Sequence, residues 1–152
     1  GGSGSLPGWY MHILVGDTIY FSANHGSSGN ELWAHDTSNA STWRVADINS
    51  GSGHSLPQLL KLVGDTFYFS ADDGSSGAEL WAHDTSNAST WQVADIVSGA
   101  GGSSPGNRMA NLVGDTLYFD AIGVSIGIEL WAHQPGEITS LGGGSPVKVL
   151  RY

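Results

Sequence analysis

Three copies of one short segment carry the side chains that could do chemistry in this sequence. Each copy reads Glu-Leu-Trp-Ala-His, so a carboxylate, an indole and an imidazole recur at alternate positions. In a β-strand, such alternation places all three side chains on one face. The set could bind a sugar, with the indole stacked on the ring and the polar groups bonded to its hydroxyls. The nine residues are Glu31, Trp33, His35, Glu79, Trp81, His83, Glu129, Trp131 and His133.

The same nine residues also have a structural interpretation, which their repetition favours. A repeated Trp is expected in the packing between neighbouring sheets, and a buried carboxylate or imidazole can satisfy backbone groups there. Three imidazoles could bind Zn²⁺ or Cu²⁺ only if they met on an axis, as a β-trefoil would allow. We therefore expect neither a metal nor another cofactor.

A second candidate binding feature is a Trp that follows the polar turn Ser-Asn-Ala-Ser-Thr in two of the copies. Trp43 and Trp91 could form exposed ligand platforms or could plug a strand end. Leu141 stands at the same offset in the third copy, so this site would exist twice. Asn39 and Asn87 begin N-x-S sequons in these turns, and they could carry glycans or serve as turn residues.

The adjacent carboxylates of Asp72 and Asp73, followed by Gly74, raise the possibility of a Ca²⁺ site. The corresponding positions in the other copies are Asn-His-Gly and Ile-Gly-Val, and the spaced acidic pattern of calcium loops is absent. A solvated turn is the better interpretation.

The segments that must position these residues belong to a tandem repeat. The phrase Leu-Val-Gly-Asp-Thr begins at Leu14, Leu62 and Leu112, giving spacings of 48 and 50 residues. Residues 14–52 and 62–100 differ at only seven of 39 positions, and the third copy diverges more. We predict a single β-repeat domain over 1–152, with repeats at about 6–55, 56–103 and 104–152.

Each repeat predicts four short antiparallel strands and no helix. In the second repeat we expect strands over 58–63, 66–71, 78–83 and 91–96. Gly64 and Asp65 form the two-residue connection of a hairpin, and Gly suits the positive φ of a primed turn. The fold class is therefore all-β, with three tandem four-stranded antiparallel repeats.

The order of motifs resembles the bacterial ELWxxDGT tandem-repeat family. The match is strongest in the second repeat, at Asp72, Asp73, Gly74, Gly77, Glu79, Leu80, Trp81, Asp84, Thr85, Val93, Asp95 and Ile96. It departs where the Asp-Gly-Thr turn of the family is Asp84-Thr85-Ser86 here. The resemblance implies secreted or cell-surface proteins built from β-propeller-like repeats.

A four-stranded unit of this length has the size of a propeller blade, and propellers typically use about 4–8 blades. Three blades need a partner to close a ring, so we expect a homo-oligomer, most simply a head-to-tail homodimer with six blades. A monomeric β-trefoil or β-prism is the alternative, because those folds close internally.

Composition narrows the function. The formal net charge is −9, and the five basic residues are scattered, which disfavours nucleic acid as a partner. Apolar runs are too short for membrane insertion, and catalytic motifs are missing, so we do not expect an enzyme. The favoured function is lectin-like binding of carbohydrate, neutral or amino sugars, through shallow repeated sites. The alternative is a non-catalytic structural or assembly module of a larger extracellular array.

Overall fold

The computed structural model describes residues 11–124, 127–135 and 137–142, and within them it contains twelve strands and no helix. Blade 1 consists of β1 (His12–Val15), β2 (Thr18–Asn24), β3 (Asn30–Asp36) and β4 (Ser41–Ala46). Blade 2 consists of β5 (Gln58–Val63), β6 (Thr66–Asp72), β7 (Ala78–Asp84) and β8 (Ser89–Ala94). Blade 3 consists of β9 (Ala110–Val113), β10 (Thr116–Gly123), β11 (Gly127–Gln134) and β12 (Glu137–Ser140).

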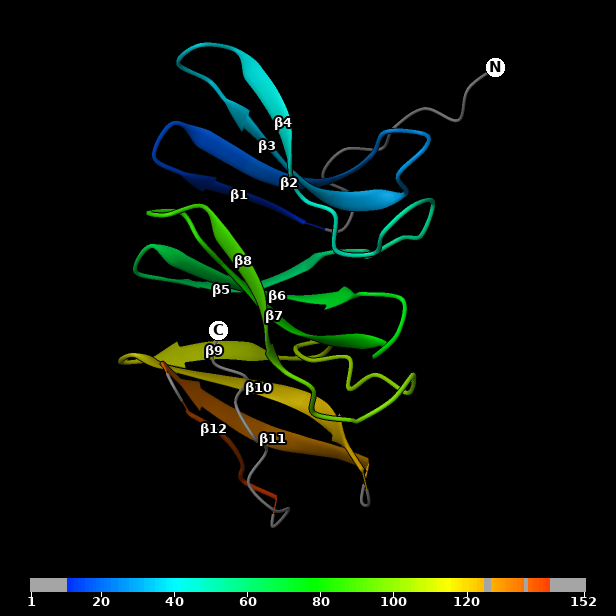
Figure 1. The fold of residues 1–152 in the computed structure, drawn as a ribbon. Helices are drawn as coiled ribbons and strands as arrows, with labels where there is room; N and C mark the ends of the chain where they lie inside the picture. Colours follow the sequence, from blue (N-terminus) through cyan, green and yellow to red (C-terminus); the bar gives the residue numbers. More distant parts are fainter. Residues whose placement is uncertain (1–10, 125–126, 136, 143–152) are drawn as a thin grey trace.

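Each blade is a separate antiparallel sheet with its strands in chain order. The three sheets stack face to face along the chain, and two connections join them (Figure 1). Linker 1 (residues 47–57) runs from β4 to β5, and linker 2 (residues 95–109) runs from β8 to β9. This is the arrangement of successive propeller blades, and a β-trefoil or β-prism does not describe it.

The first hairpin of every blade turns on a glycine, as its sequence predicts. Gly16, Gly64 and Gly114 have φ of 58°, 59° and 60°, at the first central position of a two-residue turn. Only glycine adopts this backbone without strain, which suits a type II′ hairpin. The first three predicted strands of the second repeat are confirmed to within one residue. The fourth begins and ends two residues earlier than predicted, so Asp95 and Ile96 belong to linker 2.

Alternation along the strands gives each blade two faces with different roles. We call the face that carries Tyr20, Leu32 and Ala34 in blade 1 the front face, and the face that carries Phe21, Trp33 and His35 the back face. The strand registers place the same positions on the same faces in blades 2 and 3. The front face of one blade packs on the back face of the next, and this packing makes the core.

Aromatic rings meet at both of these interfaces. Tyr20 of blade 1 lies 5.0 Å from Phe67 and 5.2 Å from His83 of blade 2, measured between ring centroids. Tyr68 of blade 2 lies 4.9 Å from His133 of blade 3. The repeated Tyr-His pair therefore joins consecutive blades, and aromatic contacts at this separation add to the stabilisation from burial.

Candidate functional site

The Glu of each of the first two Glu-Leu-Trp-Ala-His segments is buried beneath the linker that leaves its own blade. Glu31 Oε2 accepts hydrogen bonds from Ile48 N at 2.8 Å and Ser55 Oγ at 2.8 Å. Glu79 repeats the pattern, accepting from Ile96 N at 2.9 Å and Ser103 Oγ at 2.6 Å. Both side chains are fully buried. These two carboxylates hold the linkers against the sheets.

Burial and hydrogen bonding act in opposite directions on these acids. Desolvation raises the pKa of Glu31 and of Glu79, and the hydrogen bonds donated by the linkers, chiefly from Ser55 and Ser103, partly offset it. Glu129 is also buried, and Ser140 Oγ donates a hydrogen bond to it. A buried acid surrounded by protein donors has few lone pairs left for a ligand.

One serine in each linker joins two blades through its backbone. Ser55 N donates to Asn30 O in blade 1, and Ser55 O accepts from Asp72 N in blade 2, both at 2.9 Å. Ser103 makes the equivalent bonds to Ala78 and Ile122 at 2.9 and 2.8 Å. This role of the two serines is not among the sequence predictions. The signal was available, because a serine stands two residues before Pro57 and Pro105 in both linkers.

The three histidines lie apart in separate packing environments. His83 and His133 are buried between blades, whereas His35 is half-buried on the back face of blade 1. Nδ1 of His35 and of His83 is hydrogen-bonded to Thr42 and Thr90 on the neighbouring strand, at 2.7 and 2.8 Å. In the described part of the chain, no three His, Cys, Asp or Glu side chains are grouped so that they could hold a metal ion.

Burial of His83 makes the stability of the protein depend on pH. Desolvation lowers its pKa from 6.5 to about 4, so the folded state resists protonation that the unfolded chain accepts. We expect the free energy of unfolding to fall as the pH drops from 6.5 to 4, with a His83 contribution on the order of 2–3 kcal/mol. Urea unfolding across this range measures it.

His83→Gln is the control, because it removes the titration and keeps a group able to bond Thr90. The raised pKa of Glu79 changes stability in the opposite direction, and it is common to both proteins. The difference between the two pH profiles therefore isolates His83. Parallel profiles would contradict the prediction.

The Trp side chains of the three segments lie on the back faces. Trp131 is 3% exposed between blades 2 and 3, and Trp81 packs against the core between blades 1 and 2. Trp33 has no preceding blade among the described residues and stacks against His25, with ring centroids 5.5 Å apart. The indole N–H of all three is buried without a hydrogen-bond acceptor among the described residues. Trp81 and Trp131 are therefore part of the packing between blades.

Trp43 and Trp91 occupy equivalent positions and differ in exposure. Each pairs with the alanine of its neighbouring strand, Ala34 or Ala82. Trp43 is 41% exposed, whereas Trp91 packs against the core between blades 2 and 3. In blade 3 the residue that pairs with the equivalent Ala132 is Thr139, so Leu141 is not the counterpart that the offset indicated.

The polar loops use their side chains to form turns. Asp73 Oδ1 accepts from Ser75 N at 2.8 Å and from Ser76 N at 2.7 Å, and Asp72 Oδ1 accepts from Gly74 N at 2.7 Å. Burial opposes ionisation of Asp73, but these hydrogen bonds leave its pKa lowered. Asn39 and Asn87 lie exposed in the turns before β4 and β8, each accepting a hydrogen bond from the backbone two residues later.

The two outer faces of the stack carry apolar side chains that are more exposed than their equivalents between the blades. At one position of the front face, Leu32 and Leu80 are fully buried by the next blade, whereas Leu130 of blade 3 is 40% exposed. At one position of the back face, Phe69 and Phe119 are fully buried, whereas Phe21 of blade 1 is only half-buried. Each end of the stack therefore presents one half of an interface that the chain forms twice internally.

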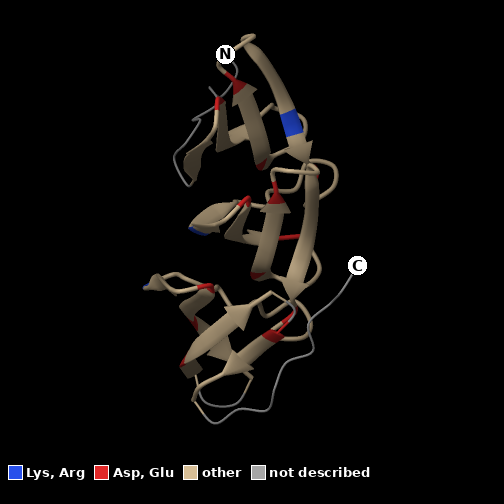
Figure 2. Cartoon of the chain, turned by 90° about the vertical axis from the view of Figure 1, so that its left-hand side faces the viewer, with Lys and Arg blue, Asp and Glu red and all other residues tan. Residues whose placement is uncertain are grey.

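Basic side chains are few and scattered over the described part of the chain. Basic positions are isolated in the cartoon, while acidic positions occur in all three blades (Figure 2). Arg44 lies in β4 and Lys61 in β5, and Arg44 pairs with Asp47 at 3.0 Å. Among the described residues no helix is long and apolar enough to cross a membrane.

Comparison with known proteins identifies a similar architecture. No family model matches the chain. No curated protein matches it either. Among solved structures, TolB from Acinetobacter baumannii superposes with a TM-score of 0.54 over 98% of this chain, at 18% sequence identity. The chain spans 32% of the length of that protein. At this identity the similarity concerns the fold alone, and it agrees with β-propeller-like tandem sheets.

Proposed function

We propose that this chain is a non-catalytic assembly module whose three blades complete a six-bladed ring with a second copy. The observation that carries the proposal is the exposure of Leu130, at a position that is fully buried in both preceding blades. An exposed apolar face of this kind is typical of an interaction surface. A cyclic dimer would cover the front face of blade 3 with the back face of blade 1, twice by symmetry.

The front face of blade 3 contains a hollow that could accept side chains from the second copy. This hollow of about 240 Å³ is lined by Thr116, Tyr118 and Ala132, among others. In blade 1 the equivalent Tyr20 contacts Phe67 and His83 of the next blade. The corresponding side chains on the free back face are Ile19 and His35, which would enter the hollow from a second copy. Membership of the ELWxxDGT repeats and an extracellular location remain part of this proposal.

The test is the oligomeric state in solution. We expect sedimentation velocity to find a dimer, and Leu130→Glu to convert it to a monomer that keeps its β-sheet circular dichroism. Val124→Glu is the matched control, because it introduces the same charge at a 74% exposed loop position outside the hollow. A wild-type protein that sediments as a folded monomer at every concentration would overturn the proposal.

Carbohydrate binding is a second candidate function, favoured by the exposed indole of Trp43 on β4. An aromatic ring that is open to solvent can stack on the apolar face of a neutral or amino sugar. We expect Trp43→Ala to abolish glycan-array signal and the accompanying change in Trp fluorescence. Trp91→Ala serves as the comparison, since Trp91 is partly buried against the core and its loss should reduce stability instead. A blank array with wild-type protein would remove this candidate.

A further inference from the structure

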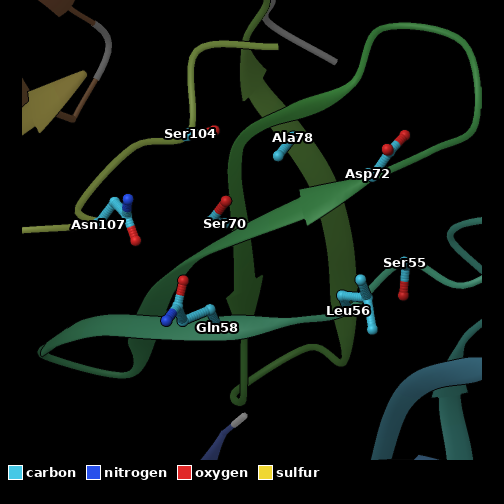
Figure 3. Close-up of a pocket in the computed structure, with 8 residues that line it drawn as sticks. All are labelled: Ser55, Leu56, Gln58, Ser70, Asp72, Ala78, Ser104 and Asn107. Carbon is cyan, nitrogen blue, oxygen red and sulfur yellow. The ribbon is translucent and has the colours of Figure 1, made fainter. Parts of the chain in front are cut away.

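A cavity of about 290 Å³ lies where linker 1 and linker 2 approach the same end of blade 2 (Figure 3). Gln58 at the start of β5 and Ser70 in β6 are register partners and form one wall. Leu56 of linker 1 lines one side, and Ser104 and Asn107 of linker 2 line the other. Asp72, at the end of β6, contributes a carboxylate.

Most of the polar side chains around this cavity are free to bond a ligand, the exception being Ser55, whose hydroxyl donates to Glu31. Those of Gln58, Ser70, Ser104 and Asn107 make no hydrogen bond to any described residue, although Ser70 is only 6% exposed. Asp72 uses Oδ1 on the backbone of its own turn, and Oδ2 has no partner among the described residues. Elsewhere in the same blade, buried polar side chains such as Glu79 are bonded by neighbours. Because these side chains line the cavity and have no partner among the described residues, they are available to bond a ligand there.

The cavity coincides with the place where the chain departs from its own repeat. Four residues lie between Pro57 and Leu62, but six lie between Pro105 and Leu112, and Asn107 belongs to that longer segment. Asp120 replaces the serine of the other blades, and its Oδ1 accepts from Arg108 N at 3.0 Å and Met109 N at 2.9 Å. Asp120 therefore holds the longer segment of linker 2 against β10.

A second departure concerns the residue that follows the linker serine. It is Leu56 in linker 1 and Ser104 in linker 2, and both adopt a left-handed backbone, with φ of 47° and 48°. The two linkers thus keep one local conformation, while the side chain changes from apolar to polar.

We infer that this cavity binds a single sugar-sized polyol, and an amino sugar in preference to a neutral or acidic one. Amides and hydroxyls both donate and accept hydrogen bonds, which matches the hydroxyl groups of such a ligand. The volume is at the lower limit of small-molecule pockets, which run from roughly 300 Å³ upward. Leu56 offers an apolar contact to the ring. The lining contains a carboxylate and no Lys or Arg, so a ligand amine is favoured and an anion is disfavoured.

Titration calorimetry and ligand-observed NMR test the inference with three probes: glucosamine, glucose and glucuronate. We expect binding in the order glucosamine, glucose, glucuronate. Asp72→Asn should bring glucosamine to within about twofold of glucose, because the amide keeps an oxygen for Gly74 N while losing the charge. Wild-type protein that binds none of the three, or that binds glucuronate best, would overturn the inference.

Two variants localise the binding. Ser104→Leu installs the residue that linker 1 carries on the same backbone, so it should preserve the fold while filling the cavity and weakening glucosamine binding at least about tenfold. Asn107→Ala changes an exposed side chain of the insertion and should weaken binding about three- to tenfold. Ser52→Leu, in the exposed part of linker 1, is the control.

These results are independent of the assembly and of Trp43. Binding that survives Ser104→Leu and Asn107→Ala but is lost in Trp43→Ala would overturn the cavity as the site. Binding that follows the two cavity variants in a monomeric protein would support the cavity while the ring proposal fails.

Discussion

Replacing Glu79 with alanine is expected to lower the free energy of unfolding by about 3–5 kcal/mol, because donors of linker 2 lose their hydrogen-bond acceptor. Ile96 N, Val97 N and Ser103 N all donate to this carboxylate, as does Ser103 Oγ. Without it, Ile96 N, Val97 N and Ser103 Oγ have no other acceptor among the described residues, whereas Ser103 N keeps its bond to Ala78 O. Urea unfolding near neutral pH measures the loss.

Two matched variants make this result specific. Glu79→Gln keeps the shape and one acceptor oxygen, and should lose about half as much stability. Glu129→Ala should cost less than Glu79→Ala, because among the described residues only Ser140 donates to Glu129. If Glu79→Ala lost less than about 1 kcal/mol, the linker would have to be held by the backbone bonds of Ser103 alone.

Replacing Phe69 with alanine is expected to cost about 3–5 kcal/mol, the usual range for removing a fully buried aromatic ring. Phe69 belongs to the core between blades 1 and 2, and its ring lies 5.7 Å from that of Phe67. The resulting cavity cannot close easily, because the surrounding strands are fixed by their hydrogen-bonded register. The free energy of unfolding measures this change as well.

The chain provides its own control at Phe21, the same position in blade 1. An isolated chain leaves Phe21 half-buried, so Phe21→Ala should cost about 1–2 kcal/mol in a monomer. In a closed ring the two substitutions should cost similar amounts, and Phe21→Ala should also weaken the dimer. A smaller loss from Phe69→Ala than from Phe21→Ala would contradict the assignment of the core.

The repeat made most of the fold predictable. Gly64-Asp65 fixes the first hairpin of its blade, and alternation in Glu-Leu-Trp-Ala-His separates the two faces of the third strand. The fourth strand was placed two residues late because Val-Ala-Asp-Ile continues the apolar pattern into linker 2. There Ile96 N bonds the side chain of Glu79 instead of a neighbouring strand.

The candidate sites were less predictable, because they depend on which groups meet in space. Sequence spacing cannot show that Ser55 and Ser103 lie over Glu31 and Glu79, 24 residues earlier. Nor can it show that Trp91 packs against the core while Trp43 is exposed, since the flanking sequences differ only at Arg44 and Gln92 from the turn to the end of the strand. The difference arises from the neighbouring blade. The sequence shows local departures from the repeat, such as the insertion that contains Asn107. Only the structure shows that Asn107 lines a cavity.

The bonds between Glu31 and linker 1 also bear on how the chain reaches its fold. They join residues only 17 to 24 positions apart, so blade 1 can form all of them once Ser55 has left the ribosome. Such low contact order favours fast folding, and N-terminal units generally fold first during synthesis. Each blade can thus fold in turn as it leaves the ribosome, and the front face of the blade already folded is the surface on which the next blade packs.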